Sequence, residues 1–108
     1  MDDALIDDIE RSLMIGLNVI VICGTRAEAM KAMSDVYKQA ETAGHEIVMR
    51  KRYQELNHGN AKAVFLSSGQ DQRGLNCDYL IVGKGVSLER NPWIHPYVYI
   101  AKMTNIQS

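Results

Sequence analysis

The feature that most constrains the fold is the segment NVIVIC at positions 18–23, whose last five residues are apolar and mostly β-branched. Strands buried on both faces have this composition, and they occur mainly in parallel sheets flanked by helices. The run stops at Gly24, and Thr25 and Glu28 then have the spacing of a helix capping box. We therefore predict a central strand followed directly by a helix over residues 26–43.

The remaining segments predict an α/β fold around that strand. Apolar residues recur at helical spacing from Leu5 to Leu13, which indicates an amphipathic helix over residues 2–15. Strand-like runs follow at 46–49, on both sides of the turn NHGN at 57–60, at 79–82 and, as an edge strand, at 97–100. This order predicts a single α/β domain over residues 1–108, with a mixed sheet of four to five strands and two main helices. Two helices leave part of one sheet face open, which favours a homodimer.

The composition excludes several classes of protein. With 46% hydrophobic and 23% charged residues among 108, the chain is typical of a globular domain, and no apolar run approaches the roughly 18 residues that cross a bilayer. Asp2 and Asp3 stand where a secretory signal would carry positive charge. Cys23 and Cys77 form neither a CxxC pair nor part of a zinc spacing. We therefore expect a cytoplasmic protein with no membrane contact, no metal and no cofactor.

Charge is distributed unevenly along the chain. Residues 1–49 carry a net charge of −5 and residues 50–108 a net charge of +4. Basic side chains interleaved with an aromatic ring suit a nucleic-acid backbone and a stacked base. The candidate nucleic-acid-binding residues are therefore Arg50, Lys51, Arg52, Tyr53, Lys62, Arg73 and Lys84. Strand alternation would place Arg50 and Arg52 on one face and Lys51 on the other, so a solvated strand end is the alternative interpretation.

A second candidate site lies between the central strand and its helix. Backbone N–H groups at Gly24, Thr25 and Arg26 could hold a phosphate, assisted by the helix dipole and the Arg26 guanidinium. The capping box offers a purely structural explanation for the same residues. Nucleophilic catalysis is not predicted, because the chain has no G-x-S-x-G elbow and no base can be assigned to its serines.

The C-terminal segment NPWIHPYVYI suggests a surface for contacts with another protein. Trp93, Tyr97 and Tyr99 stand in a stretch interrupted by prolines, and large aromatic side chains dominate protein interfaces. Segments of this kind also cover the core of their own domain, and that alternative stays open here.

The order of segments resembles a known family. NVIVICGTRAEAMKAMSDVYKQAETAGHE, then YQELNHGNAKAVFLSS, then QDQRGLNCDYLIVGKG, about two thirds of the chain, resemble the ATPase core of phage terminase large subunits and related helicase-like P-loop proteins. In that family a strand and helix follow the phosphate-binding loop, and an arginine-glycine pair, here Arg73-Gly74, precedes the strand with the magnesium-handling acids. The resemblance implies a Rossmann-like, P-loop-ATPase-like fragment of phage origin, located in the cytoplasm of the host cell.

The departures from that family concern its catalytic parts. No G-x-x-x-x-G-K-[ST] motif occurs, and the positions of the acidic pair are occupied by Gly83 and Lys84. Phosphoryl transfer without a phosphate cradle and without magnesium ligands loses its electrostatic stabilisation. The resemblance therefore implies a degenerate relative that does not hydrolyse ATP. The alternative is that Gly83-Lys84-Gly85 is an ordinary turn after a buried strand.

Together these observations predict a non-catalytic binding or regulatory module that acts through protein–protein contacts, including contacts with a second copy of itself. The first alternative is a nucleic-acid-binding accessory protein that uses the basic C-terminal half. The second is a residual nucleotide or phosphate binder at Gly24–Arg26.

Overall fold

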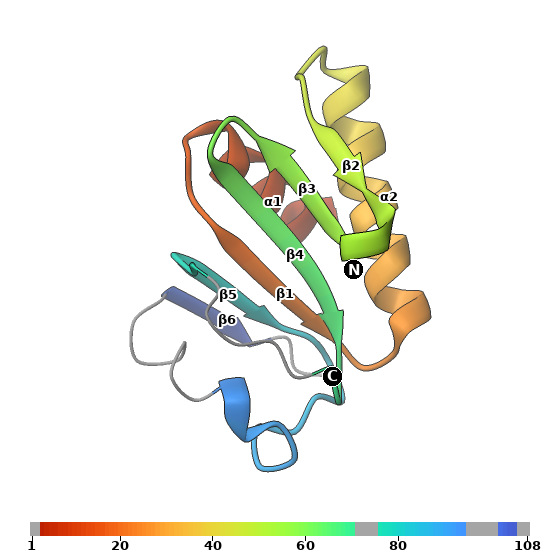
Figure 1. The fold of residues 1–108 in the computed structure, drawn as a ribbon, viewed down its shortest axis with the longest axis vertical. Coiled ribbons are helices and arrows are strands. Elements are labelled where there is room, and N and C mark those ends of the chain that lie inside the picture. The colour runs from red at the N-terminus through yellow and green to blue at the C-terminus, as the bar shows by residue number, and fades with distance from the viewer. Residues whose placement is uncertain (1–2, 71–75, 95–101, 106–108) are drawn as a thin grey trace.

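The computed structural model describes residues 3–70, 76–94 and 102–105, and Figure 1 shows their arrangement. Two α-helices, six strands and two short 3₁₀ helices follow one another in these residues. Their bounds are α1 (Asp3–Met14), β1 (Val19–Cys23), α2 (Arg26–Thr42), β2 (Val48–Arg50), η1 (Lys51–Tyr53), β3 (Glu55–His58), β4 (Ala61–Ser67), β5 (Tyr79–Val82), η2 (Pro92–Ile94) and β6 (Lys102–Asn105).

The six strands form one mixed sheet in the order β2-β3-β4-β1-β5-β6. β1 lies at its centre, parallel to β4 and β5, with Val21 opposite Phe65 on one side and Ile81 on the other. β3 is antiparallel to both of its neighbours, β2 and β4. β2 therefore runs in the same direction as β4, β1 and β5.

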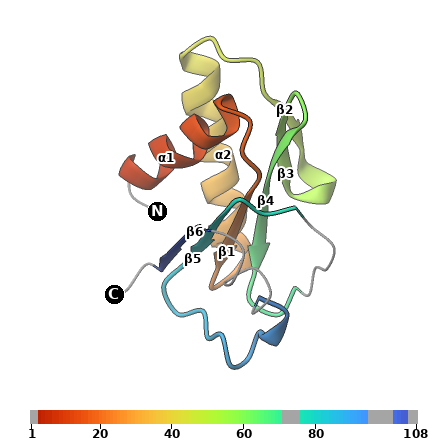
Figure 2. The same ribbon diagram turned by 90° about the vertical axis from the view of Figure 1, so that its left-hand side faces the viewer.

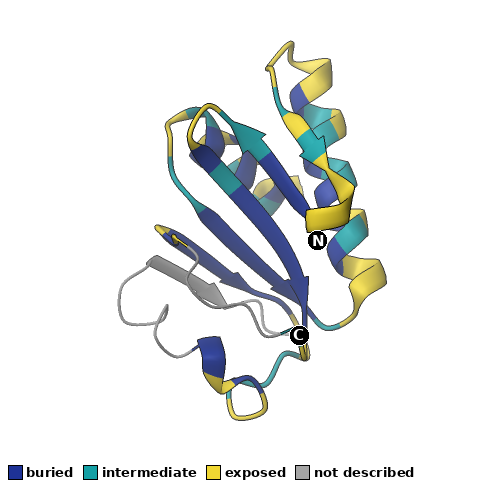
Figure 3. Ribbon diagram, in the orientation of Figure 1, coloured by how far each residue is buried: buried dark blue, intermediate teal, exposed yellow. Residues whose placement is uncertain are grey.

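Both α-helices lie on the same side of the sheet (Figure 2). Their apolar stripes meet alternate residues of β1, β4 and β5 in one core cluster. The opposite face of β1, β4 and β5 is covered by the segment that follows β5, through Val86, Leu88, Trp93 and Ile94. Figure 3 shows the result, since β1 and β5 are buried along their whole length and β4 along most of it.

The predicted start and end of α2 are confirmed. Thr25 Oγ1 accepts a hydrogen bond of 3.2 Å from the Glu28 N–H and donates one of 3.0 Å to Glu28 Oε1. The Thr25 side chain thereby gives the Glu28 N–H a hydrogen-bond acceptor, which N–H groups in the first turn of a helix otherwise lack. Gly44, with φ of +79°, follows the last turn in the left-handed conformation that glycine adopts most readily.

The predicted fold class, a single α/β domain with a mixed sheet and two main helices, is confirmed. β2 begins at Val48 and reaches Arg50, slightly later than the predicted strand 46–49. The predicted edge strand at 97–100 lies outside the described residues, whereas β6 forms that edge and brings the sheet to six strands. No helix in the described part of the chain is long and apolar enough to cross a bilayer.

Candidate nucleic-acid interface

The strands β2, β3 and β4 present a polar surface on the side of the sheet opposite the helices. Residues paired directly across strands share a face, so the pairing Arg50–Glu55–Val64 places Arg50 with Val64, which belongs to the core cluster on that side. Two residues away, Val48, Asn57 and Lys62 occupy the same face. We call this set the open face: Val48, Arg50, Glu55, Asn57 and Lys62.

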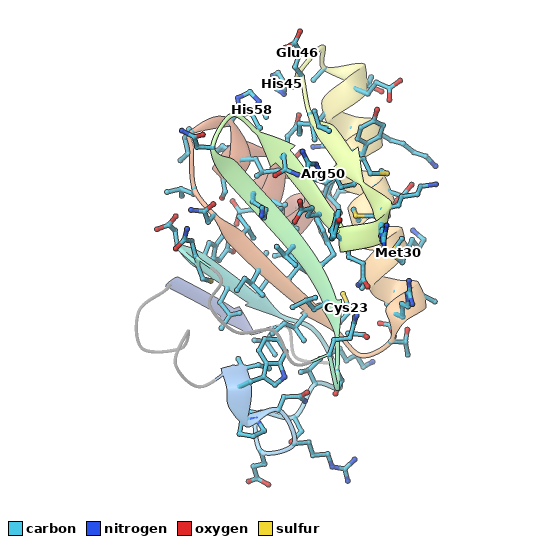
Figure 4. The ribbon with its side chains drawn as sticks, in the orientation of Figure 1. Cys23, Met30, His45, Glu46, Arg50 and His58 are labelled. Carbon is cyan, nitrogen blue, oxygen red and sulfur yellow. The ribbon has the colours of Figure 1, made fainter. Side chains whose placement is uncertain are left out.

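The acidic side chain of the open face, Glu55, already has two partners on the same face. Glu55 Oε2 lies 3.4 Å from Lys62 Nζ, and Glu55 Oε1 accepts a hydrogen bond of 3.3 Å from Asn57 Nδ2. Val48 is 59% exposed, and Arg50 is exposed as well. The Arg50 side chain is labelled in Figure 4. This part of the sheet therefore presents polar and positively charged groups to the solvent.

The predicted alternation of Arg50, Lys51 and Arg52 is wrong, because β2 ends at Arg50. Lys51, Arg52 and Tyr53 form the 3₁₀ turn η1, and all three side chains are exposed, Tyr53 to 60%. The Arg52 guanidinium carbon lies 6.0 Å from the centroid of the Tyr53 ring, at the limit of a cation–π contact. The turn is visible as an exposed block after β2 in Figure 3. We define the basic surface as Arg50, Lys51, Arg52, Tyr53 and Lys62.

A buried glutamine fixes this turn to the sheet. Gln54 has φ of +53°, which is unusual for a residue other than glycine, and its N–H donates to the Lys51 carbonyl at 3.1 Å. Its carbonyl accepts from the Phe65 N–H at 2.8 Å, and its Nε2 donates to the Phe65 carbonyl at 2.7 Å. Both the backbone and the side chain of Gln54 are thus held by β4, which defines the position of η1.

Gln54 is also joined to the chain that leaves β4. The side-chain amides of Gln54 and Gln70 exchange hydrogen bonds of 3.1 and 3.0 Å, and Gln70 Oε1 accepts from the N–H and the hydroxyl of Ser67 at 2.8 Å each. Neither glutamine is among the site residues predicted from the sequence. No local pattern marks them, because the pair joins positions 16 residues apart and depends on the register of the hairpin.

Five of the seven predicted nucleic-acid-binding residues lie on the β2–β3–β4 side of the sheet, Arg50 and Lys62 on the open face and the other three in the turn that follows β2. Lys84 lies elsewhere, on the helix side of the sheet, where it lines a hollow of about 280 Å³ with Lys31, Asp35 and Cys23 among others. Arg73 lies outside the described residues.

At the predicted phosphate site, formed by Gly24, Thr25 and Arg26, the side chains that cap α2 take up the position where a phosphate would bind. The Glu28 carboxylate accepts from the Thr25 hydroxyl and places a negative charge at the start of α2, where a phosphate would have to lie. Arg26 is exposed. The geometry of these residues favours the capping interpretation.

Gly83 has a steric role at the position where the terminase resemblance expects an acid. A Cβ atom at Gly83 would lie 2.9 Å from the Ile22 carbonyl oxygen, which already accepts a hydrogen bond of 2.7 Å from the Gly83 N–H. The backbone therefore leaves no space for a side chain at this position. The Val86 N–H donates to the Gly83 carbonyl at 3.3 Å, and Gly85 has φ of +82°, as in an ordinary turn.

The expectation that Trp93 is a surface contact residue is wrong. Trp93 is only 8% exposed and packs in the cluster that covers the second face of β1, β4 and β5. Apolar side chains of β1 and β5 on this face need a cover that the two helices, on the other side, do not supply. Tyr97 and Tyr99 lie outside the described residues.

The two cysteines are free, buried and located on opposite faces of the sheet. Burial raises the pKa of each thiol to about 11, so both are neutral and weakly nucleophilic at physiological pH. The described residues contain no group of three potential metal ligands.

A further polar cluster joins α1 to the end of α2. The buried Glu10 carboxylate accepts 2.8 Å from Gln39 Nε2 and lies 2.7 Å from His45 Nδ1. His45 and its neighbour Glu46 are labelled in Figure 4. These bonds join α1 to the last turns of α2 and to the residue that follows its C-terminal glycine, which gives the cluster a structural explanation.

Comparison with known proteins adds no further assignment. No family model matches the chain, and neither a curated protein nor a solved structure is significantly similar to it.

Proposed function

We propose that this protein is a non-catalytic nucleic-acid-binding module and that single-stranded nucleic acid binds along the basic surface. One observation carries the proposal: η1 presents three successive cationic and aromatic side chains, Lys51, Arg52 and Tyr53, to the solvent from one fixed turn. Cations neutralise phosphates and release their counterions, while a tyrosine ring stacks on a base of any identity.

The electrostatics of the surface support an anionic partner. Among the described residues, none of Arg50, Lys51 and Arg52 forms an ion pair with an acid. The acid on the open face, Glu55, is already bound to Lys62 and Asn57. The uncompensated charge of the basic surface is therefore positive.

The rigidity of the turn supports binding as well. A contact residue that is mobile before binding loses conformational entropy on binding, which lowers the affinity. The hydrogen bonds of Gln54 to Lys51 and Phe65, and the amide pair with Gln70, hold the backbone of η1 in one position. The ligand would then order only the ends of three exposed side chains.

The experiment is a fluorescence anisotropy titration of a labelled oligothymidylate and a labelled DNA duplex at several salt concentrations. We expect the single strand to bind more tightly, with affinity that falls linearly in log salt. Lys51→Glu/Arg52→Glu should abolish binding. Tyr53→Ala should weaken it by roughly the 1–3 kcal/mol of one stacked base, and Tyr53→Phe should retain it.

The matched control is Lys38→Glu/Arg90→Glu, which changes the net charge equally at two exposed positions away from the basic surface. This variant should lower the affinity only slightly, through the long-range field. Equal losses in the two charge-reversed variants would show a nonspecific effect of net charge. Absence of binding by the wild type at low salt would refute the proposal.

A further inference from the structure

The free edge of the sheet at β2 has features of its own, and only Arg50 belongs both to this edge and to the basic surface. Among the described residues, β2 is the first strand in the sheet order and pairs only with β3. An edge strand presents unpaired backbone groups to which another strand can bind.

The hairpin determines which residues of β2 direct their backbone groups outward. Gly59 and Asn60 form a two-residue connection, so His58 and Ala61 close it as a hydrogen-bonded pair. Hydrogen-bonded and non-hydrogen-bonded pairs alternate along antiparallel strands, so Asn57 and Glu55 direct their backbone groups away from β4 and toward β2. Val48 and Arg50 then bond to β3, whereas Met49 and the preceding Ile47 direct theirs to the free edge.

The side chains around this edge form a self-complementary sequence. Residues 46–50 read EIVMR, an acid and a base separated by three apolar residues. An antiparallel copy related by a twofold axis through Val48 would place Glu46 opposite Arg50 of the second copy, and the reverse. Ile47 would pair with Met49 of the second copy, so the outward-directed backbone groups would meet each other.

The exposure of these residues agrees with such pairing. Val48 is 59% exposed, and Glu46 and Arg50 are exposed with no ion pair to any described residue. Figure 4 shows Glu46 and Arg50 near opposite ends of β2. On the helix side, a hollow of about 310 Å³ lined by Tyr37, Glu41 and residues 45–48 lies beside the strand. The helix side next to the strand is therefore hollowed and not filled by side chains of α2.

We propose that β2 pairs with β2 of a second copy of this chain, antiparallel and centred on Val48, so that the two sheets become continuous. The charges select this arrangement, because like charges opposite each other destabilise a strand pair. Parallel pairing in register would place Glu46 against Glu46, and antiparallel pairing centred on Arg50 would place Arg50 against Arg50. The short strand limits the contact area, so the dimer is weak and dissociates on dilution.

Sedimentation velocity over a wide concentration range tests the proposal. The wild type should show a monomer–dimer equilibrium, and Glu46→Arg or Arg50→Glu should each weaken it at least tenfold. The double variant Glu46→Arg/Arg50→Glu should restore dimerisation, because both pairs are then reversed. A mixture of the two single variants should also form a heterodimer, in which arginines of one copy face glutamates of the other.

Circular dichroism of each variant confirms that it is folded, which is expected because both positions are exposed. Lys51→Glu/Arg52→Glu should leave the dimer intact, which separates this proposal from nucleic-acid binding. A wild type that stays monomeric at the highest concentration would overturn the proposal. Dimers that persist in both single variants, or that do not return in the double variant, would overturn it equally.

Discussion

The centre of the sheet and its β2–β3 side obey different physical requirements. β1 and β5 are buried on both faces, under the helices on one side and under Trp93 and Ile94 on the other. β2 and β3 bury Leu56 and part of Met49 on the helix side, whereas on the open face Glu55 is buried beneath its partners and Val48 and Arg50 are exposed. Packing therefore restricts which residue types can stand in the centre. The exposed positions of the β2–β3 side are not restricted in this way, so their side chains can serve binding.

The largest expected difference between the two regions is the cost of removing a side chain. Phe65 is fully buried in β4, so Phe65→Ala should lower the free energy of unfolding by about 3–5 kcal/mol. Val48→Ala on β2 should change it by less than about 0.5 kcal/mol. Urea unfolding followed by circular dichroism measures both, and similar values for the two variants would contradict the comparison.

A smaller effect is expected at the closest backbone contact of the centre. Gly83→Ala introduces a Cβ atom 2.9 Å from the Ile22 carbonyl oxygen, so β1 and β5 must move apart. We expect a loss of about 1–3 kcal/mol in the free energy of unfolding, as for other overpacked sites. Lys84→Ala, at the exposed neighbouring position, serves as the control and should be nearly neutral. An unchanged midpoint for Gly83→Ala would show that the close approach is easily relieved.

On the β2–β3 side, the amide pair of Gln54 and Gln70 should be measurable as a coupling energy. Gln54→Ala and Gln70→Ala each break the same two hydrogen bonds of 3.1 and 3.0 Å. The double variant should therefore lose less stability than the two single variants together, by about 1 kcal/mol. Strict additivity would indicate that the two side chains do not support η1 jointly. Oligothymidylate binding should weaken in all three variants, because the turn is less ordered.

The smallest effect is a pH dependence that arises from the two thiols of the centre. Their pKa is raised to about 11 in the folded protein, above the 9.0 of an unburied thiol. The unfolded state therefore loses these protons first, so their contribution to stability is constant below pH 9 and is lost between pH 9 and 11. At pH 9.5 the loss should stay below about 1 kcal/mol for each thiol. Cys77→Ala should reduce the difference between urea midpoints at pH 7.5 and 9.5, and an unchanged difference would assign it to other groups.

Much of the centre was predictable from the sequence, because its signals are local. The apolar runs that became β1 and β5, the Thr25–Glu28 cap and the turn NHGN each depend on a few neighbouring residues. Burial on both faces of β1 followed from composition alone, since an unbroken β-branched run has no side that tolerates water.

The candidate interface was predictable only in part. The sequence indicated the cluster from Arg50 to Tyr53, but strand alternation divided it between two faces, because the end of β2 was not visible in the residues. That end depends on the register of β3 against β4 and on Gln54, whose backbone and side chain bond to Phe65. Similarly, the sequence left open whether Trp93 contacts another protein or covers its own core, because the cluster that it joins includes Ile20, which is distant in the chain.

The sequence by itself therefore determined the two α-helices, the strands β1 and β5, the β3–β4 hairpin, the capping of α2 and the position of the basic residues along the chain. The tertiary structure decided that Lys62 joins Arg50 on the open face, that Gly83 has no space for a side chain, and that β2 is left at an edge. The physical reason is the range of the interactions. Propensity and periodicity act between neighbouring residues, whereas strand order, register and close backbone contacts arise only when distant segments pack together.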